Sequence, residues 1–456
     1  MQAKNPKIHV ERSFYRSLLA LTLPVALQNV ISYSVNLMDT LMLGGLGEVA
    51  LSATSLANQV FFIYTVAIFG VAGGAIVLCS QYWGKKDVDS ICRVASLALR
   101  ISAAAGLLFT LVLFLFPRPV MQIFTAEPAV IEAGASYLRI VSLSYFFYGV
   151  TSTFLVVLRS VETVNVSVAI YGVSFAVNVF FNYVFIFGKF GAPRMGVAGA
   201  AWATILSQGV SALLCLVYML KKFPILRTGR ADWAWHGPMV RRLARMGIPT
   251  ALSNSVTAIG CMILQVTING FGSTVVAAYT AASKVEQLTT QPTFTFGLAA
   301  ATFTAQNAGA GKLDRVKDGV RKATVLNLIA GLAAAVVVWL FAAPITTWFV
   351  DPGETAVIAA SVQFLNIEAV FILALGVLFV YRNALQGLGN AVMPLISGGV
   401  ELAMRLAAAI LLSRFLGYVG VCLANPVAWT GAAVMLVPAY LAELRRQQNN
   451  ALARAR

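Results

Sequence analysis

Residues 24–29 read PVALQN and residues 249–254 read PTALSN, so one hydrophobic pattern with its proline occurs twice in the chain. The shift that carries Pro24 to Pro249 needs no gap as far as Asp89, and it aligns Gly45 with Gly270, Gly47 with Gly272, Gln81 with Gln306 and Asp89 with Asp314. Identity at a fixed period marks two copies of one structural unit. In a hydrophobic chain, such a repeat is typical of a transporter whose site lies where the copies face each other.

The composition places the chain in a membrane. Of its 456 residues, 59% are hydrophobic and 11% are charged, and the mean hydropathy is +0.81. Soluble domains carry about 25% charged residues, and a chain this apolar cannot cover its hydrophobic surface in water. The five cysteines have no paired or zinc-type spacing and there are two histidines, so we expect no disulfide framework, metal site or cofactor.

Twelve apolar runs are long enough to cross a bilayer, which takes about 20 residues in a helix. We therefore predict an all-α membrane protein with twelve transmembrane helices. The predicted spans are 16–43, 48–81, 94–116, 131–158, 165–188, 196–220, 241–269, 274–307, 323–347, 356–381, 393–413 and 418–443.

Basic residues alternate between the connections of these helices. With the N-terminus inside, the inner segments hold 25 lysines and arginines, and the outer segments hold four: Arg118, Lys189, Arg194 and Arg414. Because inner segments of membrane proteins are enriched in basic residues, we expect both termini to be cytoplasmic in a plasma membrane, the inner membrane of a bacterium. The net charge of +16 then favours anionic membrane lipid as a partner and argues against nucleic acid.

An even number of helices separates equivalent points of the two repeats. Both halves therefore share one orientation and are related by a pseudo-twofold axis along the membrane normal. We predict an N-lobe of six helices over residues 1–220, a cytoplasmic linker over 221–240, and a C-lobe of six helices with a basic tail over 241–456. We expect a monomer.

One carboxylate lies within the first predicted helix. Asp39 comes about five residues, or ~7 Å along a helix, before the outer break at Gly44, and the repeat places Leu264 at the same point of the second half. An ionisable group in hydrocarbon costs about 2.5–3.5 kcal/mol on insertion scales and therefore needs a function or a partner. We predict that Asp39 binds and releases a proton or a small cation such as Na⁺. The structural alternative is an aspartate that bonds neighbouring backbone or reaches the outer interface.

Polar residues on the fifth and sixth predicted helices are expected to complete this site. Asn178 and Asn182 are four residues apart and share one helix face. Ala200 belongs to a run of small residues that permits close helix contact, and the hydroxyl of Thr204 follows it. We expect Asp39, Asn178, Asn182 and Thr204 to form one polar pocket, although the two amides suit interhelical hydrogen bonding equally well.

Further charged residues fall within the spans. Glu286 either faces the central cleft, where it attracts cations, or pairs with a base such as Arg405. Glu401 and Arg405 are four residues apart and are expected to pair with each other. Glu368 lies near the middle of its span and Arg139 lies in the fourth span, and the sequence assigns neither a partner.

Aromatic faces attract organic cations, so aromatic and polar side chains of the spans are candidates for the substrate cleft. Most aromatic residues of such a chain face lipid or the core instead. Together with Glu286, the candidate substrate contacts are Asn29, Asn254, Gln59, Phe62, Tyr148 and Phe294.

The sequence has no nucleotide-binding or catalytic motif. There is no Gly-rich phosphate loop that ends in GKS or GKT, and there is no HExxH, GxSxG or CxxC pattern. We therefore expect neither direct use of ATP nor enzymatic activity.

Both halves contain short motifs. They are Met38-Asp39-Thr40 followed by Gly45-Leu-Gly47, Gln81-Tyr-Trp-Gly84, Leu158-Arg159-Ser160, Gly196-Val-Ala-Gly199-Ala200, Ser283-Lys-Val-Glu286-Gln287, Gln306-Asn307-Ala-Gly309 and Gln386-Gly387-Leu-Gly389. Together these motifs resemble those of the multidrug and toxic compound extrusion (MATE) transporters. The resemblance implies two six-helix lobes that form a V, alternating access, and cation-coupled export of organic cations.

The resemblance also implies roles for particular residues. Asp39 matches the acid of the family's first helix, and Asn178 and Asn182 match an Asn-x3-Asp pattern on the fifth helix. Ala200 and Thr204 match sixth-helix positions near that site. Asn182 stands where the family often has Asp, which weakens sodium binding and favours a proton on Asp39.

These observations predict a secondary active antiporter that exports an amphipathic, cationic small molecule in exchange for protons or sodium. The alternative is a lipid-linked oligosaccharide or polysaccharide flippase of the same broader superfamily. A flippase needs a basic cleft that holds pyrophosphate. The bases within the spans are few and lie near acids, which disfavours that alternative.

Overall fold

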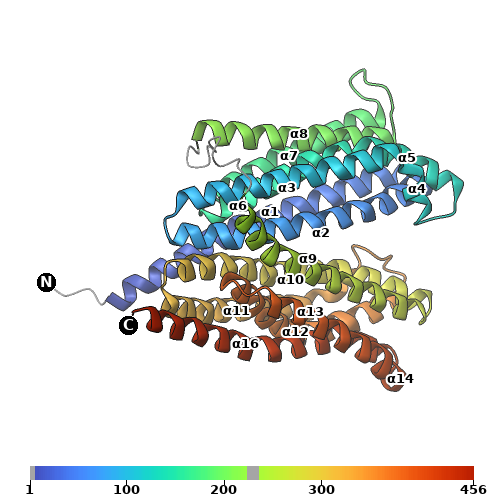
Figure 1. Ribbon diagram of the computed structural model, residues 1–456. Helices are drawn as coiled ribbons and strands as arrows, with labels where there is room; N and C mark the ends of the chain where they lie inside the picture. The colour runs from blue at the N-terminus through green and yellow to red at the C-terminus, as the bar shows by residue number, and fades with distance from the viewer. Residues whose placement is uncertain (1–5, 223–235, 456) are drawn as a thin grey trace. The chain divides into compact units, whose positions relative to one another are not determined.

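The structure is a computed structural model that describes residues 6–222 and 236–455. Within these ranges every regular element is a helix, as the apolar runs predict (Figure 1). In chain order the helices are α1 (Pro6–Gly44), α2 (Glu48–Gly84), α3 (Val88–Leu115), α4 (Pro117–Gln122), α5 (Pro128–Val141), α6 (Leu143–Ser160), α7 (Asn165–Phe187), α8 (Val197–Lys222), α9 (Gly237–Asn269), α10 (Ser273–Gly309), α11 (Leu313–Thr346), α12 (Thr355–Gly387), α13 (Val392–Ala407), the π-helix η3 (Ala408–Leu412), α14 (Ser413–Leu416), α15 (Tyr418–Cys422) and α16 (Ala424–Ala455).

The twelve predicted spans coincide with helices or with runs of consecutive helices. In the described part of the chain, ten helical segments are long and apolar enough to cross a membrane, and the pair α5–α6 adds an eleventh if it forms one span. The remaining predicted span lies in α10, a helix of 37 residues that is not among those ten. Many Thr, Ser and Gln residues lower the hydropathy of α10.

The fourth predicted span, 131–158, is not one straight helix, because α5 and α6 are bent by 50° at Ser142. Side chains from other helices donate to backbone carbonyls on either side of the bend. Thr110 of α3 donates to the carbonyl of Ser142 at 2.6 Å, and Tyr64 of α2 donates to the carbonyl of Tyr145 at 2.6 Å. A side chain that inserts into the hydrogen-bond ladder of a helix permits such a bend.

The chain forms two compact units, and the divisions fall inside helices and not in loops. The N unit is Leu23–Ile248, and the C unit comprises the residues up to Thr22 and those from Pro249 onward. Both divisions lie beside a proline within a helix, Pro24 in α1 and Pro249 in α9. Proline has no N–H and interrupts the helical ladder, so each helix can end one unit and begin the other there.

The predicted lobes, 1–220 and 241–456, remain a prediction. Most of the predicted linker between them, 223–235, lies outside the described residues.

The first turns of α9 belong to the N unit and pack tightly on α2. A methyl group on Gly247 would lie 2.6 Å from the carbonyl oxygen of Gly70, and one on Gly74 would lie 2.9 Å from the carbonyl oxygen of Leu243. Small residues let two helix backbones approach this closely. The first helix of the second repeat therefore completes the unit that is built mainly from the first repeat.

Both repeats make the same turns. Gly47 precedes α2 with φ of 106°, and Gly272 precedes α10 with φ of 93°, a backbone region that favours glycine. At the next turn the same repeat alignment pairs Lys86, with φ of 62°, with Gly311, with φ of 73°. Lys86 therefore holds a left-handed conformation for which the second repeat uses glycine.

Candidate functional site

A polar centre in the N unit joins α1 to α7. The Nδ2 atom of Asn182 donates to Oδ1 of Asp39 at 2.5 Å and to Oδ1 of Asn178 at 3.0 Å. Both asparagines are buried, and Asp39 is partly buried. The structure therefore brings together three of the residues that the sequence assigned to one polar pocket.

The oxygen atoms of this centre suit a small cation. Among the described residues, the buried Oδ1 atom of Asn182 has no hydrogen-bond partner, although buried polar atoms normally have one. Asp39 and Asn178, which both accept from the amide nitrogen of Asn182, add further oxygen atoms to the same centre. Hard cations prefer oxygen ligands, and a carboxylate can also take up a proton.

The two predicted residues on α8 differ in their contacts. Ala200 is buried in the same cluster as Leu43 of α1 and Tyr137 of α5. Thr204 donates to the carbonyl of Ala200 at 3.0 Å, within its own helix. The sequence analysis missed Tyr137, whose buried phenol lies near Asp39. A tyrosine in an apolar helix carries no sequence signal that separates this position from a core position.

The aromatic candidate Tyr148 packs inside a cluster of the N unit. Its ring centroid lies 5.0 Å from that of Phe61 and 6.2 Å from that of Tyr64. Tyr64 in turn stacks on Tyr145, with 4.9 Å between the centroids. This cluster lies against the start of α6 and supports the bend between α5 and α6.

A second polar centre lies in the C unit. Arg382 of α12 forms an ion pair with Glu401 of α13 and donates to Oγ of Ser397 at 3.1 Å. Ser253 of α9 donates to the carbonyl of Pro394 at 3.3 Å. These buried contacts tie α9, α12 and α13 together.

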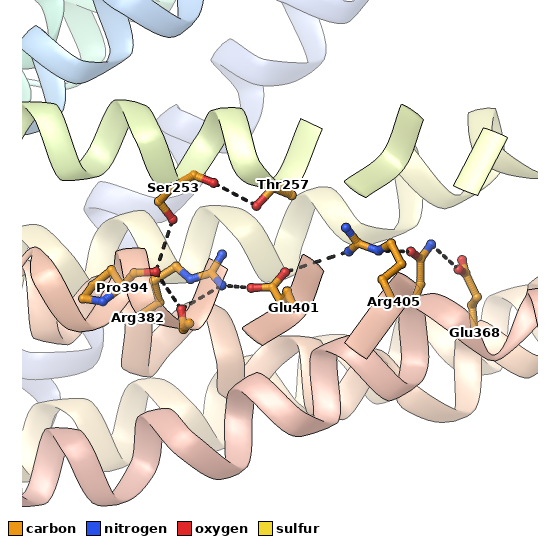
Figure 2. Close-up of polar contacts among 9 residues, drawn as sticks. Ser253, Thr257, Glu368, Arg382, Pro394, Glu401 and Arg405 are labelled. Carbon is orange, nitrogen blue, oxygen red and sulfur yellow. Dashed lines mark hydrogen bonds and ion pairs between the residues drawn. The ribbon is translucent and has the colours of Figure 1, made fainter. Parts of the chain in front are cut away.

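The network continues from α13 to α16. Arg405 places Nη2 3.9 Å from Oε2 of Glu401, and its Nε atom donates to Oδ1 of Asn425 at 2.9 Å. Asn425 donates to Oε1 of Glu368 at 2.8 Å. Figure 2 shows the contacts of the C unit in one line from Ser253 to Glu368. The guanidinium of Arg405 occupies the space that a side chain at Gly260 of α9 would need.

A cavity of about 300 Å³ lies beside this network, within the C unit. Its lining includes two predicted substrate contacts, Glu286 and Phe294, together with Cys261. The carboxyl of Glu286 lies next to that of Glu368. The five other predicted substrate contacts do not line this cavity: Tyr148, which packs in the N-unit cluster, Asn29, which is partly buried, and Asn254, Gln59 and Phe62, which are exposed.

The two polar centres fall at similar places in the repeats but differ in charge. The shift that carries Pro24 to Pro249 also carries Asp39 to Leu264, which is buried, and Asn178 to Ala403, next but one to Arg405. The C unit therefore has a guanidinium near the place where the N unit has an amide, and an apolar side chain where the N unit has its aspartate. The two units offer different chemistry.

The structure adds to the expectations about three charged residues. Glu401 forms the ion pair with Arg405 that its spacing predicts, and it pairs more closely with Arg382. Arg382, which we counted among the basic residues of the inner segments, is buried in α12. Arg139 is exposed, and its Nε atom donates to the carbonyl of Phe114 near the end of α3 at 3.3 Å.

Comparison with known proteins finds matches over both repeats. The MatE family model matches residues 24–184 and 249–411. A probable multidrug resistance protein NorM of Thermotoga maritima is 27% identical over 422 residues, which cover 91% of this chain and 88% of the relative. The multidrug resistance protein NorM of Photobacterium profundum is 24% identical over 394 residues, 82% of this chain and 84% of the relative.

Solved structures share the fold. A crystal structure of MATE in the bent conformation aligns with a TM-score of 0.89 at 20% identity, over 96% of this chain and 97% of that chain. A MOP superfamily transporter from Pyrococcus furiosus aligns with a TM-score of 0.88 at 20% identity, over 95% of this chain and 96% of that chain.

Proposed function

Since this chain belongs to the MatE family of transporters, we propose that it is a secondary active multidrug efflux antiporter. It exports amphipathic organic cations by alternating access in exchange for protons or sodium ions. It acts in the plasma membrane, with both termini in the cytoplasm. The names of the multidrug resistance relatives support drug export, and the distribution of basic residues supports the orientation.

The hydrogen bond between Asn182 and Asp39 is the observation that carries this proposal. It joins α1 to α7 through an ionisable group in an apolar helix. Ionisable groups within membrane spans usually mark ion or proton pathways. A proton or a sodium ion that binds Asp39 competes with the amide of Asn182 for the carboxylate. Occupancy therefore changes the contact between two helices, and a ligand shifts a conformational equilibrium through such a difference in interaction.

The proton is the favoured coupling ion. The N-unit centre has a single carboxylate, Asp39, and the neighbouring positions Asn178 and Asn182 are neutral amides. One proton neutralises the centre, whereas a sodium ion needs several oxygen ligands and gains less from one charge than from two.

We place the positively charged group of the substrate in the C-unit cavity. Glu286 provides a carboxylate there. Phe294 packs edge-on against Phe379, with 5.4 Å between the ring centroids, and aromatic rings attract organic cations. A cavity of about 300 Å³ is at the small end of ligand sites, which span roughly 300–1,000 Å³. The cavity is therefore large enough for the cationic group of a drug but small for a whole large drug molecule.

The test is transport in vesicles that contain purified protein. We expect Asp39→Asn to abolish gradient-driven efflux of ethidium while the protein still inserts and folds. The matched control is Asp351→Asn, because Asp351 is exposed and accepts a bond from its own loop, at Gly353. Full efflux by Asp39→Asn would exclude Asp39 as the coupling site.

The coupling ion is identified in the same vesicles by imposing proton and sodium gradients one at a time. A proton gradient alone should drive efflux by the wild-type protein. Efflux that follows only the sodium gradient would overturn the preference for the proton.

A further inference from the structure

Another cavity lies in the N unit around α4, between the end of α3 and the start of α5 (Figure 1). Its volume is about 580 Å³, within the roughly 300–1,000 Å³ of ligand sites. Three charged side chains line it: Arg118 of α4, and Glu132 and Arg139 of α5. Its lining among the described residues includes no residue that we assign to ion or substrate binding. The cavity is thus a charged site that transport does not use.

The sequence of α5 places three lining residues on one helix face. Glu132, Ser136 and Arg139 have the spacing i, i+4 and i+7, which lines up side chains along a helix. All three are exposed. Long side chains in a helix point back toward its N-terminus, so Arg139 is directed toward the end of α5 that carries Glu132. The three polar groups therefore converge on one space.

The two guanidinium groups of the cavity are unequally paired. Nη2 of Arg118 lies 2.5 Å from Oε2 of Glu132, with side chains 65% and 67% exposed, and ion pairs this exposed contribute little. Among the residues that the structure describes, Arg139 has no carboxylate partner; its Nε atom donates to the carbonyl of Phe114 at 3.3 Å, and its guanidinium lies 5.6 Å from the centroid of that ring. A guanidinium has several N–H donors, so Arg139 keeps donors for a ligand.

Basic residues are scarce at this end of the helices. In the proposed orientation the outer segments hold four lysines and arginines against 25 in the inner segments, and Arg118 is one of the four. Arg139 adds a second guanidinium to the same cavity from the adjoining span. Because outer segments normally avoid basic residues, a pair of them in one cavity indicates an anionic ligand. Guanidinium groups bind phosphate oxygens through pairs of hydrogen bonds.

An apolar surface leads from the cavity along α3. Leu115 lines the cavity, and Leu111 and Leu108 continue the same helix face. These three leucines are 54%, 56% and 59% exposed. Within a membrane span, exposed leucines contact the acyl chains of lipid. A ligand with a phosphate at the arginines and a hydrocarbon chain along α3 would contact both surfaces at once.

We propose that this cavity binds the phosphodiester of a monoanionic membrane phospholipid, with an acyl chain along the leucines of α3. Arg118 and Arg139 hold the phosphate oxygens, and the hydroxyl of Ser136 donates to one of them. The two guanidinium groups and Glu132 sum to a formal charge of +1, which one phosphodiester neutralises. A zwitterionic phospholipid brings a cationic group as well and leaves that charge uncompensated. In the proposed orientation the lipid belongs to the outer leaflet.

The experiment reads occupancy from a thiol that Ser136→Cys places in the cavity lining. The full chain in detergent also carries Cys261→Ser, because Cys261 is exposed and the other four cysteines are buried. The ligand concentration that halves the rate of maleimide labelling gives the affinity. Dioctanoyl phosphatidylglycerol should bind at least about tenfold more tightly than dioctanoyl phosphatidylcholine, which has the same chains, and than inorganic phosphate.

Three variants in this background test the assigned contacts. Arg139→Gln should weaken phosphatidylglycerol binding by at least about tenfold, since it removes charge-assisted hydrogen bonds. The matched control is Arg194→Gln, because Arg194 is also an exposed outer arginine but does not line the cavity; it should bind the lipid as its parent does. Glu132→Gln should strengthen binding, because it removes the carboxylate that competes with phosphate for Arg118.

Several results would overturn the inference. Equal affinity for the two lipids would indicate an apolar groove without selection for charge, and equal affinity for phosphatidylglycerol and inorganic phosphate would assign a free anion. Equal losses in Arg139→Gln and Arg194→Gln would assign the effect to overall charge. If Arg139→Gln does not fold, Glu132→Gln decides, and binding no tighter than its parent would count against the inference. These measurements use no ion gradient and no transported cation, so they are independent of the proposed function.

Discussion

Replacing Gly199 by Ala should destabilise the N unit, because Gly199 of α8 packs directly against the backbone of α7. A methyl group at Gly199 would lie 2.7 Å from the carbonyl carbon and oxygen of Phe185 and 2.9 Å from its Cβ atom. Nonbonded carbon atoms prefer about 3.5–4.0 Å, so the two helix backbones must separate by roughly 1 Å. Overpacking of this kind costs about 1–3 kcal/mol.

The displacement should also reach the polar centre. Phe185 follows Asn182 by three residues on α7, so moving the helix at Phe185 draws Asn182 away from Asp39 and lengthens their 2.5 Å hydrogen bond. Gradient-driven efflux by Gly199→Ala should therefore fall by more than its loss of folded protein explains.

The assay is thermal unfolding of the purified protein in detergent, together with vesicle efflux. At about 2–4 °C per kcal/mol for a unit of this size, Gly199→Ala should lower Tm by roughly 2–12 °C. The control is Gly209→Ala on the same helix, where an added methyl group meets no atom of the described residues within 4 Å. Equal Tm values for the two variants would refute the close approach of α7 and α8.

Three further predictions concern turns and ion pairs. Lys86→Gly should increase the free energy of unfolding by about 0.5–1 kcal/mol and so raise Tm, because Lys86 has a positive φ; a lower Tm would contradict this prediction. Asp87→Ala should cost about 1 kcal/mol at neutral pH, since its carboxylate caps α3 by accepting bonds from Ser90. Those bonds hold the pKa of Asp87 below its ordinary value, so the capping contribution is complete above about pH 4 and is lost as pH falls through the folded pKa; the two Tm values should converge in acid, and a constant difference would exclude this cause. Arg382→Met should lower stability by about 3–5 kcal/mol, because Glu401 loses its buried partner; an unchanged Tm would show that the pair contributes nothing.

Much of the N-unit centre could be predicted because its signals are local. The spacing of Asn178 and Asn182 places two amides on one face of a helix, and an acid in an apolar run marks Asp39. The contact between α1 and α7 then follows from the need of a buried carboxylate for a partner. Tyr137 was not predicted, because tyrosines are common in apolar helices.

The C-unit network was harder to predict, because its strongest contacts join different helices. Spacing along α13 suggested that Glu401 pairs with Arg405, yet the closer partner is Arg382 of α12. Asn425 of α16 links Arg405 of α13 to Glu368 of α12. No periodicity in one helix reports the rotation of its neighbours, so these partners appear only once the helices are packed.

By itself, the sequence determined the helical class, the twofold repeat and its glycine turns, since hydropathy and backbone conformation depend on residues close together in the chain. The tertiary structure alone decided where α5 and α6 bend, which base neutralises which acid, and that Glu286 lies beside Glu368. These features depend on how helix faces meet across long separations in the chain. In a bilayer the partners open to a buried polar group are those that this packing provides.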